Sequence, residues 1–142
     1  MGRIIAIDHG TKRVGIAATD PGRVIANGLA TVATRDVIDF LKAYVAREPV
    51  DLFVVGHPKQ MDNTDSENMS RVIPFVATLR RAFPAIPVEL HDERFTSLLA
   101  RRAIIEAGAK KKQRQDKATI DLVSATIILQ SYLERARNMT TK

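Results

Sequence analysis

Short apolar runs separated by polar turns dominate the first part of the chain. Residues 3–7 form an apolar run rich in β-branched side chains that ends at Asp8, and residues 14–18 form a second run. The polar turn between them, residues 9–13, contains Gly10. This pattern predicts two buried strands joined as a hairpin, with the carboxylate of Asp8 at its opening.

The rest of the chain alternates between strand and helix patterns. We expect strands at 23–33, 50–56 and 88–91, and helices at 35–48, from about 69 to 79, at 96–107 and at 117–137. The order is three strands, then helix, strand, helix, strand and two helices. It predicts an α/β fold with a mixed five-stranded sheet, in which an antiparallel meander is followed by parallel crossovers.

Single residues mark several of the expected element ends. Thr34 and Asp116 are the predicted N-caps of the helices that follow them. Pro74 lies inside a helical repeat of apolar residues, so it should kink that helix or mark its true start. Residues 138–142 are expected to be a frayed tail.

Length and composition restrict the class of protein. With 142 residues, the chain is expected to form a single domain that spans 1–142. It has no cysteine, which excludes disulfides and thiolate metal sites. We expect no secretory segment, because Arg3 and Asp8 bracket only a few apolar residues, and no apolar run approaches the roughly 20 residues needed to cross a bilayer. These features predict a cytoplasmic protein without a membrane partner.

The charge balance is basic. Lys and Arg number 22 against 16 Asp and Glu, a net charge of +6. This surplus favours a polyanionic partner such as nucleic acid, although a merely basic soluble protein has the same balance. Because there are only five Phe, two Tyr and no Trp, phosphate contacts rather than base stacking should carry the affinity for a nucleic acid.

Three carboxylates occupy positions that this architecture can gather. Asp8 and Glu93 follow strands, and the carboxyl ends of parallel strands are where ligands collect in an open sheet. Asp121 interrupts a mostly apolar helix, where an acid is costly unless a cation meets it. Carboxylates without His or Cys suit Mg²⁺ or Mn²⁺. Taken singly, each acid has a simpler explanation: a turn cap, an ion pair with Arg94, or a charge near a helix N-terminus.

The basic residues near these acids allow two interpretations each. Lys12 and Arg13 lie beside Asp8. They either contact a phosphate or are simply charged side chains of a solvated hairpin turn. A cationic segment stands before the last helix, as either a flap that grips phosphates or a solvated charge run; its members are Lys110, Lys111, Lys112, Arg114 and Lys117. The histidines, His9, His57 and His91, show no metal-ligand spacing.

Four motifs carry a resemblance to a known family. They are Asp8-x-Gly10-x-Lys12-Arg13-Val14-Gly15-x-Ala17, Gly56-x-Pro58, Asp92-Glu93-Arg94-Phe95-Thr96-Ser97 and Asp121-x-x-Ser124-Ala125. Together they resemble the YqgF family of small bacterial proteins, described as Holliday-junction resolvases or pre-16S rRNA nucleases. One detail differs, because the family usually has Gly after the Asp of the loop that follows the fourth strand, whereas Asn63 follows Asp62 here.

The resemblance implies a fold, a site and an activity. The fold is ribonuclease H-like, Asp8, Glu93 and Asp121 form an acidic triad, and a divalent cation is the cofactor. The implied role is maturation of the 5′ end of 16S ribosomal RNA.

Three hypotheses about function follow. The leading one is a metal-dependent RNA nuclease in which Asp8 bridges two cations and the other two acids complete the coordination. A second is a DNA endonuclease that resolves branched junctions, which should need two sites in a dimer. The third is a non-catalytic module that binds nucleic acid or a ribosomal precursor.

Overall fold

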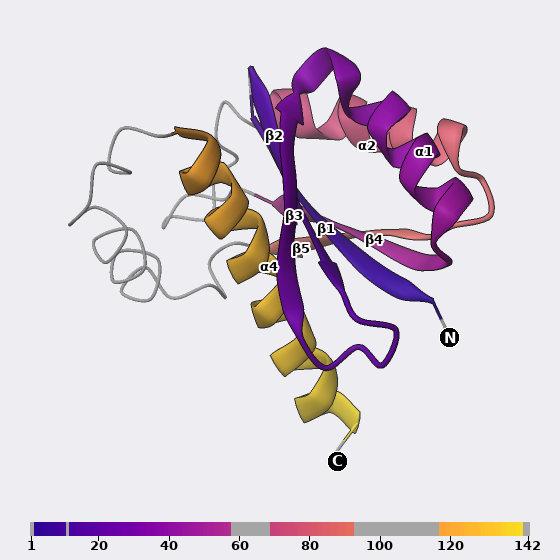
Figure 1. The fold of residues 1–142 in the computed structure, drawn as a ribbon, viewed down its shortest axis with the longest axis vertical. Coiled ribbons are helices and arrows are strands. Elements are labelled where there is room, and N and C mark those ends of the chain that lie inside the picture. The colour runs from indigo at the N-terminus through magenta and orange to yellow at the C-terminus, as the bar shows by residue number, and fades with distance from the viewer. Residues whose placement is uncertain (1, 11, 58–68, 93–116, 141–142) are drawn as a thin grey trace.

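A five-stranded mixed sheet forms the centre of the computed structural model (Figure 1). The structure describes residues 2–10, 12–57, 69–92 and 117–140, without the side chains of 57, 69–71, 92, 117–121 and 137–140. The strands are β1 (Arg3–His9), β2 (Arg13–Thr19), β3 (Ala26–Ala33), β4 (Val50–His57) and β5 (Val88–Asp92). Their order across the sheet is β3-β2-β1-β4-β5, which makes β1 the central strand.

The strand directions confirm the predicted topology. β1 pairs antiparallel with β2, and β2 pairs antiparallel with β3, so the first three strands form a meander. β4 then pairs parallel with β1, and β5 parallel with β4. The carboxyl ends of β1, β4 and β5 therefore meet at one end of the sheet.

Helices cover both faces of the sheet (Figure 1). A short 3₁₀ helix, η1 (Thr34–Asp36), leads into α1 (Val37–Arg47), and α2 (Met69–Ala82) lies with α1 on one face. The other face is covered by α4 (Lys117–Thr140). None of the helices within the described ranges is both long enough and apolar enough to span a membrane.

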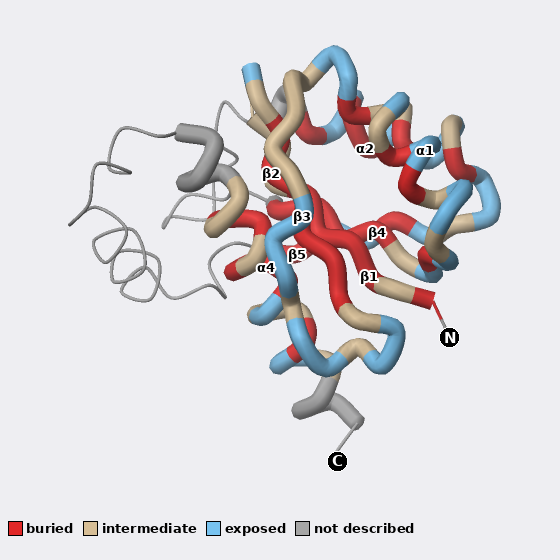
Figure 2. The backbone as a smooth tube through the Cα atoms, in the orientation of Figure 1, coloured by how far each residue is buried: buried red, intermediate tan, exposed pale blue. Residues whose placement is uncertain are grey.

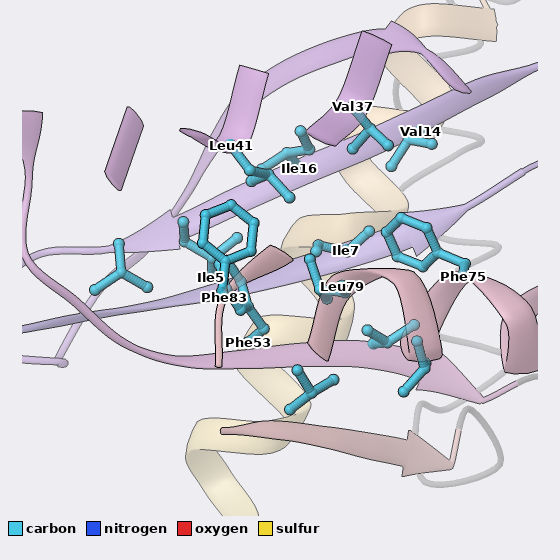
Figure 3. Close-up of a cluster of buried hydrophobic side chains, with 14 of the residues drawn as sticks. Ile5, Ile7, Val14, Ile16, Val37, Leu41, Phe53, Phe75, Leu79 and Phe83 are labelled. Atoms are coloured by element: carbon cyan, nitrogen blue, oxygen red, sulfur yellow. The ribbon is translucent and has the colours of Figure 1, made fainter. Parts of the chain in front are cut away.

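The larger hydrophobic core lies between the sheet and helices α1 and α2 (Figure 3). Alternate residues of β1, β2 and β4 contribute to it, because successive side chains of a strand point to opposite faces. The members labelled in the figure are Ile5, Ile7, Val14, Ile16, Val37, Leu41, Phe53, Phe75, Leu79 and Phe83. The strands in the middle of the sheet are buried along most of their length (Figure 2).

A second core lies under α4 and uses the intervening strand residues. The sheet contributes Ile4, Ala6, Ala17 and Val54, and α4 contributes Ala125, Ile128, Leu129 and Leu133. Several of these side chains are alanines, which allow a helix to pack closely on the sheet. Gly28 on β3 extends this contact, because a Cβ atom there would lie 2.7 Å from the Cγ atom of Leu122.

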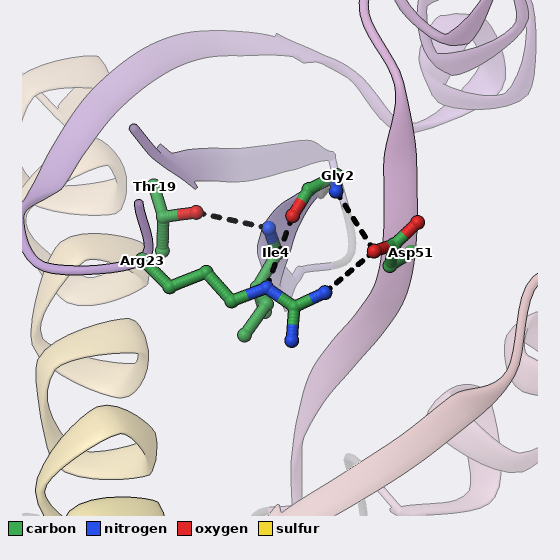
Figure 4. A network of polar contacts seen from close by, with 5 residues as sticks. All are labelled: Gly2, Ile4, Thr19, Arg23 and Asp51. Carbon is green, nitrogen blue, oxygen red and sulfur yellow. Dashed lines mark hydrogen bonds and ion pairs between the residues drawn. The ribbon is translucent and has the colours of Figure 1, made fainter. Parts of the chain in front are cut away.

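A polar network fixes the start of β1 (Figure 4). The backbone nitrogen of Gly2 donates to Oδ2 of Asp51 at 2.8 Å, and Arg23 Nη2 reaches the same oxygen at 2.6 Å. Arg23 Nε also donates to the carbonyl oxygen of Gly2 at 3.0 Å. Next to this network, the nitrogen of Ile4 donates to Thr19 Oγ1 at 3.0 Å. These contacts join β4 and the loop after β2 to the end of the sheet opposite Asp8.

Two predicted element ends differ from the structure. Thr34 was expected to cap a helix, but its hydroxyl donates to the carbonyl oxygen of Gly10 at 3.0 Å, and no side-chain hydrogen bond caps η1. α4 continues to Thr140, three residues beyond the predicted helix end at 137. No Gly or Pro occurs between 117 and 142 to end the helix earlier.

Other predictions are confirmed or fall outside the described part of the chain. Pro74 lies within α2, so it does not mark the start of that helix. The expected helix at 96–107, residues 110–114 of the cationic segment and the predicted cap Asp116 lie outside the described residues, as does the side chain of Lys117.

Candidate functional site

Asp8 is the penultimate residue of the central strand, at the sheet end where the parallel strands finish. Asp8 is half-buried. Ile4 and Ala6 belong to the core under α4, so the alternation of the strand places Asp8 on the same face. His9 takes the opposite face, where its ring stacks on Phe75 with 4.5 Å between centroids. The strand therefore separates the carboxylate from the neighbouring imidazole.

The turn after Asp8 is held from two sides. The nitrogen of Gly10 donates to the carbonyl oxygen of Arg13 at 3.0 Å, which closes the hairpin. Thr34 bonds both strands of the turn, since its nitrogen donates to the carbonyl oxygen of Lys12 at 3.0 Å and its hydroxyl donates to Gly10. A Cβ atom on Gly10 would lie 2.6 Å from the Arg13 oxygen, so this close approach requires glycine.

The two basic residues of the turn differ in exposure. Lys12 is exposed and Arg13 is half-buried, and both follow Asp8 within the same hairpin. Their position leaves both interpretations open, a phosphate contact or a solvated turn. The other predicted phosphate-binding residues, Lys110, Lys111, Lys112 and Arg114, lie outside the described residues.

α4 carries Asp121 in its second turn, one helical turn before Ala125. The backbone of Asp121 is described, and its side chain is not. The next residue, Leu122, packs over Gly28 of β3. Ser124 and Ala125 are buried against the sheet, as expected for small residues that let the helix approach closely. This part of α4 is therefore packed closely against the sheet face on which Asp8 lies.

β5 reaches the site end of the sheet through His91 and Asp92. In the parallel register, His91 lies opposite Gly56 and Asp92 lies opposite His57. Glu93 follows directly in the sequence and lies outside the described residues. Of the predicted triad, only Asp8 has a described side chain. Among the described residues, no three His, Asp or Glu side chains form a group that could hold a metal ion.

Polar side chains also join β5 to α4, in contacts that were not predicted from the sequence. His91 is buried, and its Nε2 atom lies 2.9 Å from Ser131 Oγ. Tyr132 donates its hydroxyl proton to Glu89 Oε2 at 2.6 Å. Burial, and secondarily Glu89, raise the pKa of Tyr132 to about 12.

The sequence model of the RuvX family, described as Holliday junction resolvase, matches residues 2–135. The chain belongs to the RuvX family. This assignment confirms the resemblance to YqgF, which is another name for the same family.

Full-length relatives of this RuvX chain share more than half of its residues. A protein from Parabacteroides distasonis is 61% identical over 134 residues, with 94% of this chain and 96% of its own length aligned. A protein from Phocaeicola vulgatus is 59% identical over 134 residues, with the same coverage of 94% and 96%. Both bear the name "Putative pre-16S rRNA nuclease".

Solved structures resemble this RuvX chain in fold. Thermus thermophilus RuvC in complex with a Holliday junction substrate matches with a TM-score of 0.59 and 15% identity, over 95% of both chains. The fowlpox virus Holliday junction resolvase matches with a TM-score of 0.53 and 16% identity, over 94% of this chain and 99% of its own. These likenesses confirm the predicted ribonuclease H-like fold.

Proposed function

We propose that this chain is a divalent-metal-dependent nuclease that hydrolyses RNA phosphodiester bonds in the maturation of the 5′ end of 16S rRNA. The observation that carries the proposal is the position of Asp8. This acid is the penultimate residue of the central strand, on the face covered by α4, at the end of the sheet where three parallel strands finish. The names of the curated relatives supply the substrate.

The proposed metal ligands are Asp8, Glu93 and Asp121. Glu93 lies two positions after His91, whose side chain faces α4, and Asp121 lies one turn before a residue that packs on the sheet. An all-carboxylate set fits Mg²⁺ or Mn²⁺, which prefer oxygen ligands. When bound, such cations activate water and stabilise the leaving oxygen of a phosphodiester.

The basic residues supply binding rather than chemistry in this proposal. Lys12 and Arg13 contact the phosphates on either side of the scissile bond, because the Gly10 turn holds them beside Asp8. Lys110, Lys111, Lys112 and Arg114 grip the RNA backbone further away. The net charge of +6 supports a polyanionic substrate. A nuclease of ribosomal precursors works in the cytoplasm, in contact with the precursor particle.

The test compares Asp8→Asn with wild type on an RNA that carries the 5′ extension of 16S rRNA. We expect the substitution to lower kcat by about 100-fold or more, the scale of losing a principal electrostatic group. Calorimetry should show loss of Mn²⁺ binding as well. Asp39→Asn on α1 is the matched control, since this exposed acid lies on the opposite layer. Unchanged cleavage by Asp8→Asn would remove Asp8 from the mechanism.

Junction-resolving endonuclease activity is a second candidate, and the family description favours it. The same variants on a four-way DNA junction separate the two substrates. Resolution of a symmetric junction requires two sites, so it should depend on dimer formation. Cleavage of the junction but not of the RNA would replace the first proposal with the second. A wild-type protein that binds RNA but neither binds Mn²⁺ nor cleaves would instead be a binding module.

A further inference from the structure

A partly buried hydrogen bond joins β5 to the middle of α4. His91 is 1% exposed, and its Nε2 atom lies 2.9 Å from the Oγ atom of Ser131. The imidazole also meets the ring of Tyr132 edge-on, with 6.0 Å between centroids. A polar side chain at this depth is costly without a partner, so the contact with Ser131 favours one arrangement of strand and helix.

The same helix is fixed at the opposite edge of the sheet. Leu122 packs over Gly28 on β3, one edge strand, whereas Ser131 bonds His91 on β5, the other edge strand. The two contacts lie about 14 Å apart along the helix, at 1.5 Å per residue. α4 is therefore held at both edges of the sheet.

Both fixed points adjoin residues of the proposed metal site. Leu122 follows Asp121 directly, and His91 precedes Glu93 by two positions. We propose that His91 and Ser131 are positioning residues that set where the end of β5 lies relative to α4, and so bring Glu93 and Asp121 to the spacing that the cation requires. This inference rests on the proposed function, because it concerns the geometry of that site.

The test measures the Mn²⁺ concentration that gives half-maximal RNA cleavage, together with Mn²⁺ affinity by calorimetry. Ser131→Ala should raise the required Mn²⁺ concentration about tenfold, the smaller end of what is lost when a side chain that supports metal ligands is removed. Ser131→Thr keeps the hydroxyl and should retain the wild-type requirement. All assays are run well below the thermal midpoint of each variant, which is measured separately.

Thr126→Ala is the matched control. Its hydroxyl lies on the same helix but donates to the carbonyl oxygen of Leu122 at 2.9 Å, within α4. Removing it should leave the Mn²⁺ requirement unchanged even if it lowers the thermal midpoint. A shift equal to that of Ser131→Ala would overturn the inference, because general destabilisation of the helix would then explain both results.

Two further outcomes separate this inference from the proposed function. If Asp8→Asn abolishes Mn²⁺ binding while Ser131→Ala changes neither affinity nor the metal requirement, the positioning role is wrong and the metal site stands. If wild type neither binds Mn²⁺ nor cleaves RNA, both fail together. Loss of metal affinity in Ser131→Thr as large as in Ser131→Ala would also overturn the inference, since the hydrogen bond would not be the cause.

Discussion

Gly28 lies so close to Leu122 that no side chain fits between β3 and α4. A Cβ atom on Gly28 would lie 2.7, 3.0 and 3.1 Å from the Cγ, Cδ1 and Cδ2 atoms of Leu122. The whole end of the leucine side chain would have to move to make room. Glycine at this position therefore determines how closely the Asp121 end of α4 approaches the sheet.

Gly28→Ala should lower the free energy of unfolding by about 1–3 kcal/mol, the usual cost of overpacking. The measurement is urea denaturation followed by circular dichroism. Asn27→Ala, an exposed change at the neighbouring position of β3, is the control and should stay within about 0.5 kcal/mol of wild type. Equal stability of Gly28→Ala and wild type would show that Leu122 can move freely, contrary to the packing.

Arg23 gives a second test, because it is the only described non-glycine residue with a positive φ, at 59°. Arg23→Ala and Arg23→Gly both remove the contacts with Gly2 and Asp51, but glycine tolerates this backbone conformation and alanine does not. Arg23→Gly should therefore be about 1 kcal/mol more stable than Arg23→Ala. Thermal denaturation of the two variants side by side measures the difference. If Arg23→Ala were the more stable variant, the backbone at this position would not be strained.

Asp20 organises the loop that holds Arg23. Its carboxylate accepts hydrogen bonds from the nitrogens of Gly22, Val24 and Ile25, at 3.2, 2.8 and 2.8 Å. The bonds from Ile25 and Val24 lower the pKa of Asp20 below its usual value of 3.8. Because the folded-state pKa is depressed, this contribution to stability is present above the ordinary pKa and is lost as pH falls through the folded one.

NMR titration of the Asp20 carboxyl carbon should give a pKa below 3.8. Asp20→Asn should also flatten the acid limb of the stability curve, since it removes the titrating group. A midpoint at or above the ordinary value would mean that the three backbone bonds do not form in solution.

Tyr132 allows a titration test at high pH. Its pKa is raised to about 12, first by burial and then by the hydrogen bond to Glu89. The folded state favours the neutral phenol, so its stability contribution is complete below pH 10 and is lost as pH rises toward 12. Absorbance at the phenolate band should show a late ionisation that Tyr132→Phe removes.

Glu89→Gln is the companion variant for this titration. It should lower the pKa of Tyr132 only part of the way toward its ordinary value, because burial, the larger cause, remains. Complete return to an ordinary tyrosine titration would show that Glu89, not burial, dominates.

The elements that could be predicted from the sequence depend on local patterns. The continuous apolar runs along β1 and β2 predicted two buried strands and placed Asp8 at the end of one of them. Strand direction also followed from local rules, since short turns join antiparallel neighbours and helical crossovers join parallel ones. These features need no knowledge of which distant residues meet.

The features that could not be predicted depend on contacts between distant segments. Thr is a residue type that commonly caps helices, yet the hydroxyl of Thr34 donates a hydrogen bond to the carbonyl oxygen of Gly10, because the hairpin turn lies beside it in the fold. The pairing of His91 with Ser131 likewise has no local signal, since it depends on how α4 crosses the sheet. The placement of Asp121 beside Asp8 is of the same kind, and it stays a prediction.

α4 is the last of these elements to be synthesised, and this has a consequence for folding on the ribosome. The five strands, α1 and α2 emerge first, and together they contain all the buried residues of the larger core. The opposite face, with Ile4 and Val54, stays bare until 117–140 leave the exit tunnel. A nascent chain stalled before that point exposes an apolar strand surface to chaperones and lacks Asp121, one of the proposed metal ligands.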